Sequence, residues 1–155
     1  MIASTHQCTC GCGQTAFTVS APALFRIYCH CTICQRFNDA AFADVLIFKR
    51  EDVALPPADA VSFDTYKPPP NVQRGKCASC GVPAVELFDI PLLPKLVMVP
   101  AGMFGSQGSL PDAAMHLFYD KRQADIDDAL PKFSGFLPSQ WAILSQLWSA
   151  RRRAQ

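Results

Sequence analysis

The segment Cys77-Ala78-Ser79-Cys80-Gly81 decides how the rest of this chain is interpreted. Two cysteines separated by two residues allow one tight backbone turn to direct two sulfurs at the same metal ion. The previous cysteine in the chain is Cys34, so this pair must find its remaining ligands far away in the sequence. The segment therefore predicts a metal site that ties distant parts of the chain together.

Two other cysteine clusters can supply those ligands. The N-terminal cluster offers the pair in Cys10-Gly11-Cys12-Gly13, whereas the middle cluster offers three sulfurs that can surround an ion of their own. Two pairs make a closed four-thiolate site, which holds structure, and three thiolates leave an open position for water or a substrate. We expect chemistry at the open site. The eight cysteines are Cys8, Cys10, Cys12, Cys29, Cys31, Cys34, Cys77 and Cys80.

Zinc is the metal that such clustered thiolates favour, although iron or an iron–sulfur cluster uses the same ligands. Disulfides explain the cysteines less well, because they require an oxidising compartment and the sequence offers no route to one. Residues 1–7 contain neither a basic start nor an apolar stretch, which argues against a secretory signal. We therefore expect a cytoplasmic protein with reduced cysteines.

The composition excludes several classes of protein. Of the 155 residues, 50% are hydrophobic and 17% charged, which suits one folded domain over residues 1–155 and excludes a disordered chain. The net charge of +1 includes three adjacent arginines, Arg151 to Arg153, so the remainder has no basic surface of the kind that nucleic acids require. No apolar run approaches the roughly 18 residues that span a bilayer. We expect neither nucleic-acid nor membrane partners.

Short apolar runs punctuated by proline and glycine predict a mainly β fold of short antiparallel strands. Near the C-terminus, the spacing of Trp141, Leu144 and Trp148 predicts an α-helix over residues 139–153 with Ser139 as its N-cap. The terminal arginines favour the negative pole of that helix. We expect the tryptophan face to pack on the sheet or on a partner subunit, as in a homodimer. The expected strands are residues 14–20, 24–28, 40–48, 61–66, 84–90, 96–99 and 115–119.

Three cysteine signatures occur in a fixed order along the chain. They are Cys10-x-Cys12-Gly13, then Cys29-His30-Cys31-x-x-Cys34-Gln35-Arg36, then Cys77-x-x-Cys80-Gly81. Together they resemble the glutathione-dependent formaldehyde-activating enzyme family. Phe17, residues 40–43 and residues 128–133 also resemble landmarks of that family, so the resemblance covers nearly the whole chain.

The chain departs from the family pattern at two places. Lys76 stands where the family usually has an aromatic residue, and residues 121–128 lack a tryptophan that is often found there. These departures leave the zinc sites intact and leave the identity of the substrate open.

The resemblance implies a zinc-binding fold of the β-tent type and a carbon–sulfur lyase activity, in which glutathione adds to formaldehyde to give S-hydroxymethylglutathione. The partners would be a small-molecule thiol and an aldehyde, and a related lyase would use another thiol or aldehyde. The position of Phe17 favours Cys10 with Cys12, rather than with Cys8, as the N-terminal ligand pair. The implied ligands are Cys10, Cys12, Cys77 and Cys80 for a structural zinc, and Cys29, Cys31 and Cys34 for a labile or catalytic zinc.

An open zinc site would hold a bound thiol as the thiolate, which is the nucleophile that attacks an aldehyde carbonyl. Arg36 is the first candidate contact for the glutathione carboxylates, ahead of Lys121 and Arg122. We assign no acid–base role to His30, which is expected to face solvent or to stabilise the cysteine turn. His116 is expected to be a satisfied core or edge histidine and is a second-rank site candidate.

A different class of function also fits these residues. The protein would then be a zinc-stabilised binding or chaperone-like module, with two structural zinc sites and no turnover. Ligand spacing alone does not separate a catalytic zinc from a structural one.

Overall fold

The computed structural model describes residues 5–68, 71–105 and 110–153. They group into two compact units, each built from two stretches of chain: unit 1 from residues 1–23 and 46–110, and unit 2 from residues 24–45 and 111–155. The expectation of one domain stays a prediction. Residues 1–4, part of the N-terminal segment on which the localisation prediction depends, lie outside the described residues.

The N-terminal strands of unit 1 form a three-stranded antiparallel sheet. Strand β1 (His6–Thr9) pairs with β2 (Ala16–Val19), and β2 pairs with the short β5 (Val53–Ala54). The alternation of buried and partly exposed residues along β2 matches a strand with one face on a core. The turn between β1 and β2 carries the N-terminal cysteine pair.

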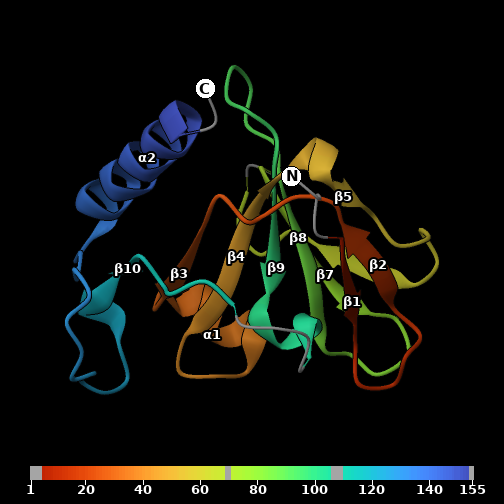
Figure 1. The fold of residues 1–155 in the computed structure, drawn as a ribbon. Coiled ribbons are helices and arrows are strands. Elements are labelled where there is room, and N and C mark those ends of the chain that lie inside the picture. The colour runs from red at the N-terminus through yellow and green to blue at the C-terminus, as the bar shows by residue number, and fades with distance from the viewer. Residues whose placement is uncertain (1–4, 69–70, 106–109, 154–155) are drawn as a thin grey trace. The chain divides into compact units, whose positions relative to one another are not determined.

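The rest of unit 1 contains an antiparallel meander, visible in Figure 1. Its strands are β6 (Val61–Asp64), β7 (Val72–Cys77), β8 (Pro83–Phe88) and β9 (Leu96–Pro100), in the order β9-β8-β7-β6. The C-terminal half of β4 (Ala43–Lys49) lies next to β9. Two 3₁₀ turns, η1 (Arg50–Asp52) and η2 (Ala101–Phe104), follow β4 and β9. The core of unit 1 includes Phe17, Leu46, Phe48, Val85, Val97, Val99 and Phe104.

Unit 2 contains β3 (Phe25–Cys29), the N-terminal half of β4, β10 (Met115–Leu117), α1 (Thr32–Asn38), the 3₁₀ turn η3 (Tyr119–Lys121) and α2 (Phe136–Arg153). The strand order is β10-β3-β4. Strand β10 runs parallel to β3, with His116 paired to Tyr28, so the expectation of antiparallel strands alone is wrong here. Parallel neighbours require a long crossover, and the chain between these two strands is long.

The fold class is confirmed: the described residues are mainly β, with two sheets and a C-terminal α-helix. The strands lie within two or three residues of their expected positions. Sequence reasoning missed β1, the two-residue β5, β7 and the short helix α1.

The start of α2 corrects one prediction. The helix begins at Phe136 and not after Ser139, because Pro138 falls in its first turn, where the missing N–H of proline costs nothing. Gly135 precedes it with a positive φ of 84°. Ser139 is buried inside the helix, where its Oγ accepts a hydrogen bond from the backbone N–H of Phe118 at 3.0 Å.

The apolar side chains of α2 also depart from expectation. Trp141, Leu144 and Trp148 are exposed by 72%, 45% and 65%, so they do not pack on a sheet as one alternative required. Packing on a partner subunit stays a prediction. Among the described residues no helix has both the length and the apolar character needed to cross a bilayer.

Candidate metal centres

In unit 1 the sulfurs of Cys10, Cys12, Cys77 and Cys80 come together. All four lie within 4.8 Å of one another. The Sγ–Sγ distances are 3.4 Å for Cys10–Cys12, 3.6 Å for Cys10–Cys77 and 3.7 Å for Cys12–Cys77. A tetrahedron with Zn–S bonds of about 2.3 Å has edges of about 3.8 Å, whereas a disulfide needs about 2.05 Å. The spacing fits a tetrahedral metal site and excludes bonded pairs.

A tight backbone turn that closes at a glycine presents each cysteine pair, and it is one residue longer at Cys77 than at Cys10. The N–H of Gly13 donates to the carbonyl of Cys10, and the N–H of Gly81 donates to that of Cys77. Gly13 and Gly81 have φ values of 79° and 77°, a region that other L-residues enter at a cost. Glycine after the second cysteine is therefore what lets each turn close.

Backbone N–H groups also point at the sulfurs. The N–H of Thr15 donates to Cys10 Sγ at 3.4 Å, and that of Cys80 donates to Cys77 Sγ at 3.5 Å. The contact from Cys80, followed by one from Thr15, lowers the pKa of Cys77 to about 5. The turn at Cys77 thus favours the thiolate, the form that binds a metal, whereas the neighbouring sulfurs, that of Cys10 first, help to raise the pKa of Cys12 to about 11.

Cys8 lies apart from this set. Its side chain is fully buried in the core of unit 1, and burial raises the pKa of its thiol to about 12. A thiol in that state behaves as a small apolar side chain. The structure therefore groups Cys12, and not Cys8, with Cys10.

In unit 2 the sulfurs of Cys29, Cys31 and Cys34 lie within 4.8 Å of one another. Cys29 ends β3, Cys31 is the N-cap of α1, and Cys34 lies in the first turn of that helix. Cys31 Sγ accepts from the backbone N–H of Cys34 at 3.3 Å. A strand end and a helix start, joined by His30, thus direct three sulfurs at one point.

Within the three-cysteine set, a neighbouring sulfur raises the pKa of Cys29 and of Cys34. The sulfur of Cys31 is the main cause that raises the pKa of Cys29, and the sulfur of Cys29 is the main cause that raises that of Cys34. Burial acts in the same direction at both residues. A bound divalent ion reverses this effect, because it deprotonates a coordinating thiol. The donors fit a soft metal ion such as zinc.

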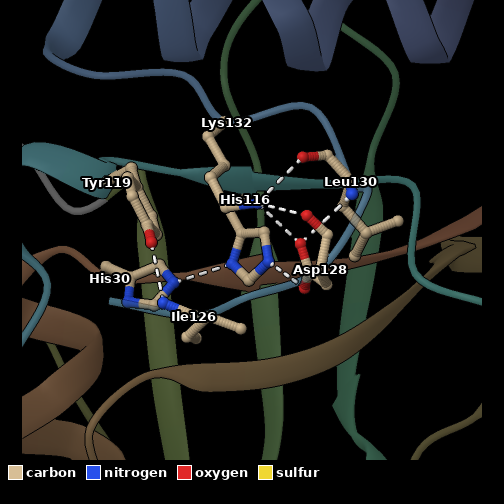
Figure 2. A network of polar contacts seen from close by, with 7 residues as sticks. All are labelled: His30, His116, Tyr119, Ile126, Asp128, Leu130 and Lys132. Carbon is tan, nitrogen blue, oxygen red and sulfur yellow. Dashed lines mark hydrogen bonds and ion pairs between the residues drawn. The ribbon is translucent and has the colours of Figure 1, made fainter. Parts of the chain in front are cut away.

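A series of polar contacts begins at the buried His30 and ends at the partly exposed Asp128 and Lys132 (Figure 2). His30 Nε2 lies 2.9 Å from His116 Nδ1, and His116 Nε2 lies 2.7 Å from Asp128 Oδ2. Lys132 Nζ lies 2.6 Å from the other carboxylate oxygen of Asp128. The side chain of Tyr119 packs edge-on against both imidazoles.

The pKa values of the groups at the two ends of this series of contacts are shifted for different reasons. Burial, followed by the neighbouring His116, lowers the pKa of His30 to about 4. The hydrogen bond from Lys132, followed by that from His116, lowers the pKa of Asp128 to about 2. Near neutral pH this series of contacts therefore joins a neutral His30 to the ionised carboxylate of Asp128.

His30 is 1% exposed and His116 is 0% exposed. The solvent-facing alternative for His30 is therefore wrong, and its burial suits the other alternative, stabilisation of the cysteine turn. His116 is a satisfied core histidine, with partners on both ring nitrogens. Sequence reasoning did not join the two histidines. Their separation of 86 positions leaves no local signal.

The three candidate contacts for the glutathione carboxylates differ in their exposure and in the partners of their side chains. Arg36 lies exposed on α1, two positions after Cys34. Arg122 lies over the ring of Tyr119, with 4.3 Å between its Cζ and the ring centroid, and pairs with Asp125. The side chain of Lys121 is exposed, and its carbonyl accepts from Gln35 Nε2. Of the three, Arg122 has an anionic partner in Asp125, and the choice of Arg36 as the first contact for a glutathione carboxylate stays a prediction.

The protein is mainly β, and its fold brings cysteine sulfurs together in one set of four and one set of three. It therefore belongs to a class of small proteins with two candidate thiolate metal centres. The chain belongs to the glutathione-dependent formaldehyde-activating enzyme family, whose sequence pattern matches residues 5–121. This assignment confirms the resemblance drawn from the cysteine signatures.

The fold is shared with a solved structure. It is the crystal structure of a Rhodobacter sphaeroides protein from a structural genomics programme, with a TM-score of 0.52 and 17% sequence identity over 68% of this chain and 97% of that one. At that identity the likeness concerns the fold alone. No protein with curated annotation matches this chain significantly.

Proposed function

We propose that this protein is a zinc-dependent carbon–sulfur lyase, which binds a thiol such as glutathione at the three-cysteine set and adds it to formaldehyde or a related aldehyde. The observation that carries the proposal is the unequal pair of donor sets in a chain of this family. Four sulfurs fill a tetrahedral shell, whereas three leave one position open.

Each donor set has its own role in this proposal. Cys10, Cys12, Cys77 and Cys80 hold a structural zinc. Cys29, Cys31 and Cys34 hold a second, more labile zinc, which when bound favours the thiolate form of an incoming thiol. Arg36 contacts a carboxylate of glutathione.

The reaction balances without a further reactant. The thiol sulfur forms a bond to the aldehyde carbon, the carbonyl π bond breaks, and the thiol proton ends on the carbonyl oxygen, which gives a hemithioacetal. The reverse direction breaks the carbon–sulfur bond, which makes the enzyme a lyase. The chain supplies the site that brings the two small molecules together in a reactive geometry.

The test is the rate of S-hydroxymethylglutathione formation, followed by proton NMR against the spontaneous reaction. The wild-type chain is expected to accelerate the exchange, and Cys31→Ser to return the rate to the spontaneous level. Arg36→Ala is expected to raise KM for glutathione more than it lowers kcat. Equal rates for the wild type and Cys31→Ser would count against the proposal.

The exposed apolar side chains of α2 favour a second candidate, a zinc-stabilised binding module without turnover. Trp141 and Trp148 are side chains that protein interfaces commonly use as anchors. The two candidates differ in one observable: the module requires no spectral or kinetic response of the three-cysteine set to glutathione.

A further inference from the structure

His30 links two members of the three-cysteine set, and the fold holds it at several points. Its backbone N–H donates to the carbonyl of Leu117 at 2.9 Å. Its own carbonyl accepts from Gln35 Nε2 at 2.6 Å. Since its side chain is buried as well, the residue between Cys29 and Cys31 is constrained through both backbone and side chain.

The donor and acceptor at each imidazole nitrogen follow from Asp128. An ionised carboxylate only accepts, so His116 Nε2 carries the hydrogen in the 2.7 Å contact. In a neutral His116 the other nitrogen, Nδ1, then accepts from His30 Nε2. His30 is thereby set in one tautomer and one orientation, and its Nδ1 has no hydrogen-bond partner among the described residues.

Stability alone does not account for this arrangement. A buried nitrogen without a partner costs free energy, and apolar side chains of similar shape often stabilise a core at least as well as a buried polar network. The Asp128 end is nevertheless fixed twice more, by Lys132 Nζ and by the backbone N–H of Leu130 at 3.1 Å. These hydrogen bonds secure the orientation of His30 (Figure 2). In the sequence His30 lies between the candidate ligands Cys29 and Cys31.

We propose that His116 and Asp128 are positioning residues, which act through His30 to hold the sulfurs of Cys29 and Cys31 in the geometry that binds a metal ion. The proposal rests on the proposed function only in taking the three-cysteine set as a metal site. Without His116, the Nε2–H of His30 is buried with no acceptor. Rotation of His30 toward water relieves that cost and twists the backbone between the two cysteines.

The test is a cobalt titration of the full chain, reduced and free of other metals. Cobalt bound by thiolates gives intense charge-transfer absorption, and Cys31→Ser identifies the step that belongs to the three-cysteine set. His116→Leu removes both hydrogen bonds, and we expect it to weaken cobalt binding at that step about tenfold to a hundredfold while the four-cysteine step is unchanged. Asp128→Asn is expected to act in the same direction.

His116→Gln serves as the rescue variant, because its amide keeps one acceptor and one donor. We expect it to recover most of the affinity that leucine loses. Asp44→Ala is the matched control: it removes the ion pair with Arg26 at 2.7 Å, also in unit 2, and leaves the histidine contacts in place. Its cobalt titration should match that of the wild type.

Equal cobalt affinity of the wild type and His116→Leu at the three-cysteine step would overturn the proposal. An equal loss in Asp44→Ala would also overturn it, because the effect would then be general destabilisation. So would a wild-type titration that contains no step sensitive to Cys31→Ser. A wild-type spectrum that does not respond to glutathione bears on the proposed function alone, since the comparison of variants uses no thiol.

Discussion

Glycine at two positions makes the four-cysteine set possible. Gly13 and Gly81 both adopt a positive φ directly after a cysteine, and a Cβ built at either would have no atom within 4 Å. Space is therefore not what excludes other residues there. The backbone conformation alone carries the cost of a side chain.

That cost can be measured at Gly81. Gly81→Ala is expected to lower the free energy of unfolding by about 1–2 kcal/mol, because alanine must enter the left-handed region. Urea unfolding of the metal-loaded chain gives the value. Gly102→Ala is the control, since a Cβ there also meets open space and its φ is not positive, so no loss of stability, or a small gain, is expected.

A single lysine, Lys132, favours the ionised form of the Asp128 carboxyl group. Lys132→Met should raise the pKa of Asp128 from about 2 toward its ordinary value of 3.8, since the hydrogen bond from Lys132 is the main cause of the depression. Carbon-13 NMR of the carboxyl group follows the titration. Lys121→Met, at an exposed lysine of the same unit, should leave that pKa in place.

The same shift has a defined effect on stability. Because its pKa is lowered in the folded state, Asp128 stabilises the fold above about pH 4 and loses that contribution as the pH falls through about 2. In Lys132→Met the contribution becomes smaller. Acid unfolding midpoints that are identical for the two chains would contradict this assignment of the ion pair.

At the scale of elements, α2 buries Ser139, Ala142 and Ala150, and the hydrogen bond of Ser139 is one of the contacts that anchor the helix. Ser139→Ala removes the acceptor for the backbone N–H of Phe118 and should cost about 1–3 kcal/mol of unfolding free energy. Ser145→Ala on the exposed side of the same helix should have little effect, or stabilise slightly through helix propensity. Differential scanning calorimetry of both variants separates anchoring from propensity.

The elements that the sequence could predict are those with a local signal. Apolar runs bounded by turn residues place most strands, and the spacing of Trp141, Leu144 and Trp148 places the C-terminal helix. Helix α1 could not be predicted from the sequence, because it has only seven residues and its N-cap is a cysteine side chain, which is not a usual cap.

Pairings between distant segments were harder to predict. Ligand counting joins Cys77 and Cys80 to an N-terminal pair, because a zinc shell requires four donors. No such count joins His30 to His116, and nothing local signals that β10 runs parallel to β3. The candidate metal sets were therefore accessible from sequence, whereas the contacts around the three-cysteine set were not.

At the scale of the whole molecule, the two cysteine sets should respond differently to loss of a ligand. Cys77→Ser should destabilise the chain strongly, because binding free energy at a structural zinc contributes to folding. Cys31→Ser should leave the fold in place and abolish thiol binding. Circular dichroism melting combined with glutathione titration reads both effects, and equal thermal destabilisation by the two variants would contradict the division of roles.

The most direct test of the account is the zinc content per chain, measured by elemental analysis on protein purified under reducing, chelator-free conditions. The measurement is repeated after excess glutathione and desalting. We expect two zinc ions per chain at first and one after thiol treatment, because the closed four-thiolate set has no vacancy and the three-thiolate set does. Two zinc ions that never respond to the thiol would contradict the central claim that the three-cysteine set is an open, thiol-responsive site.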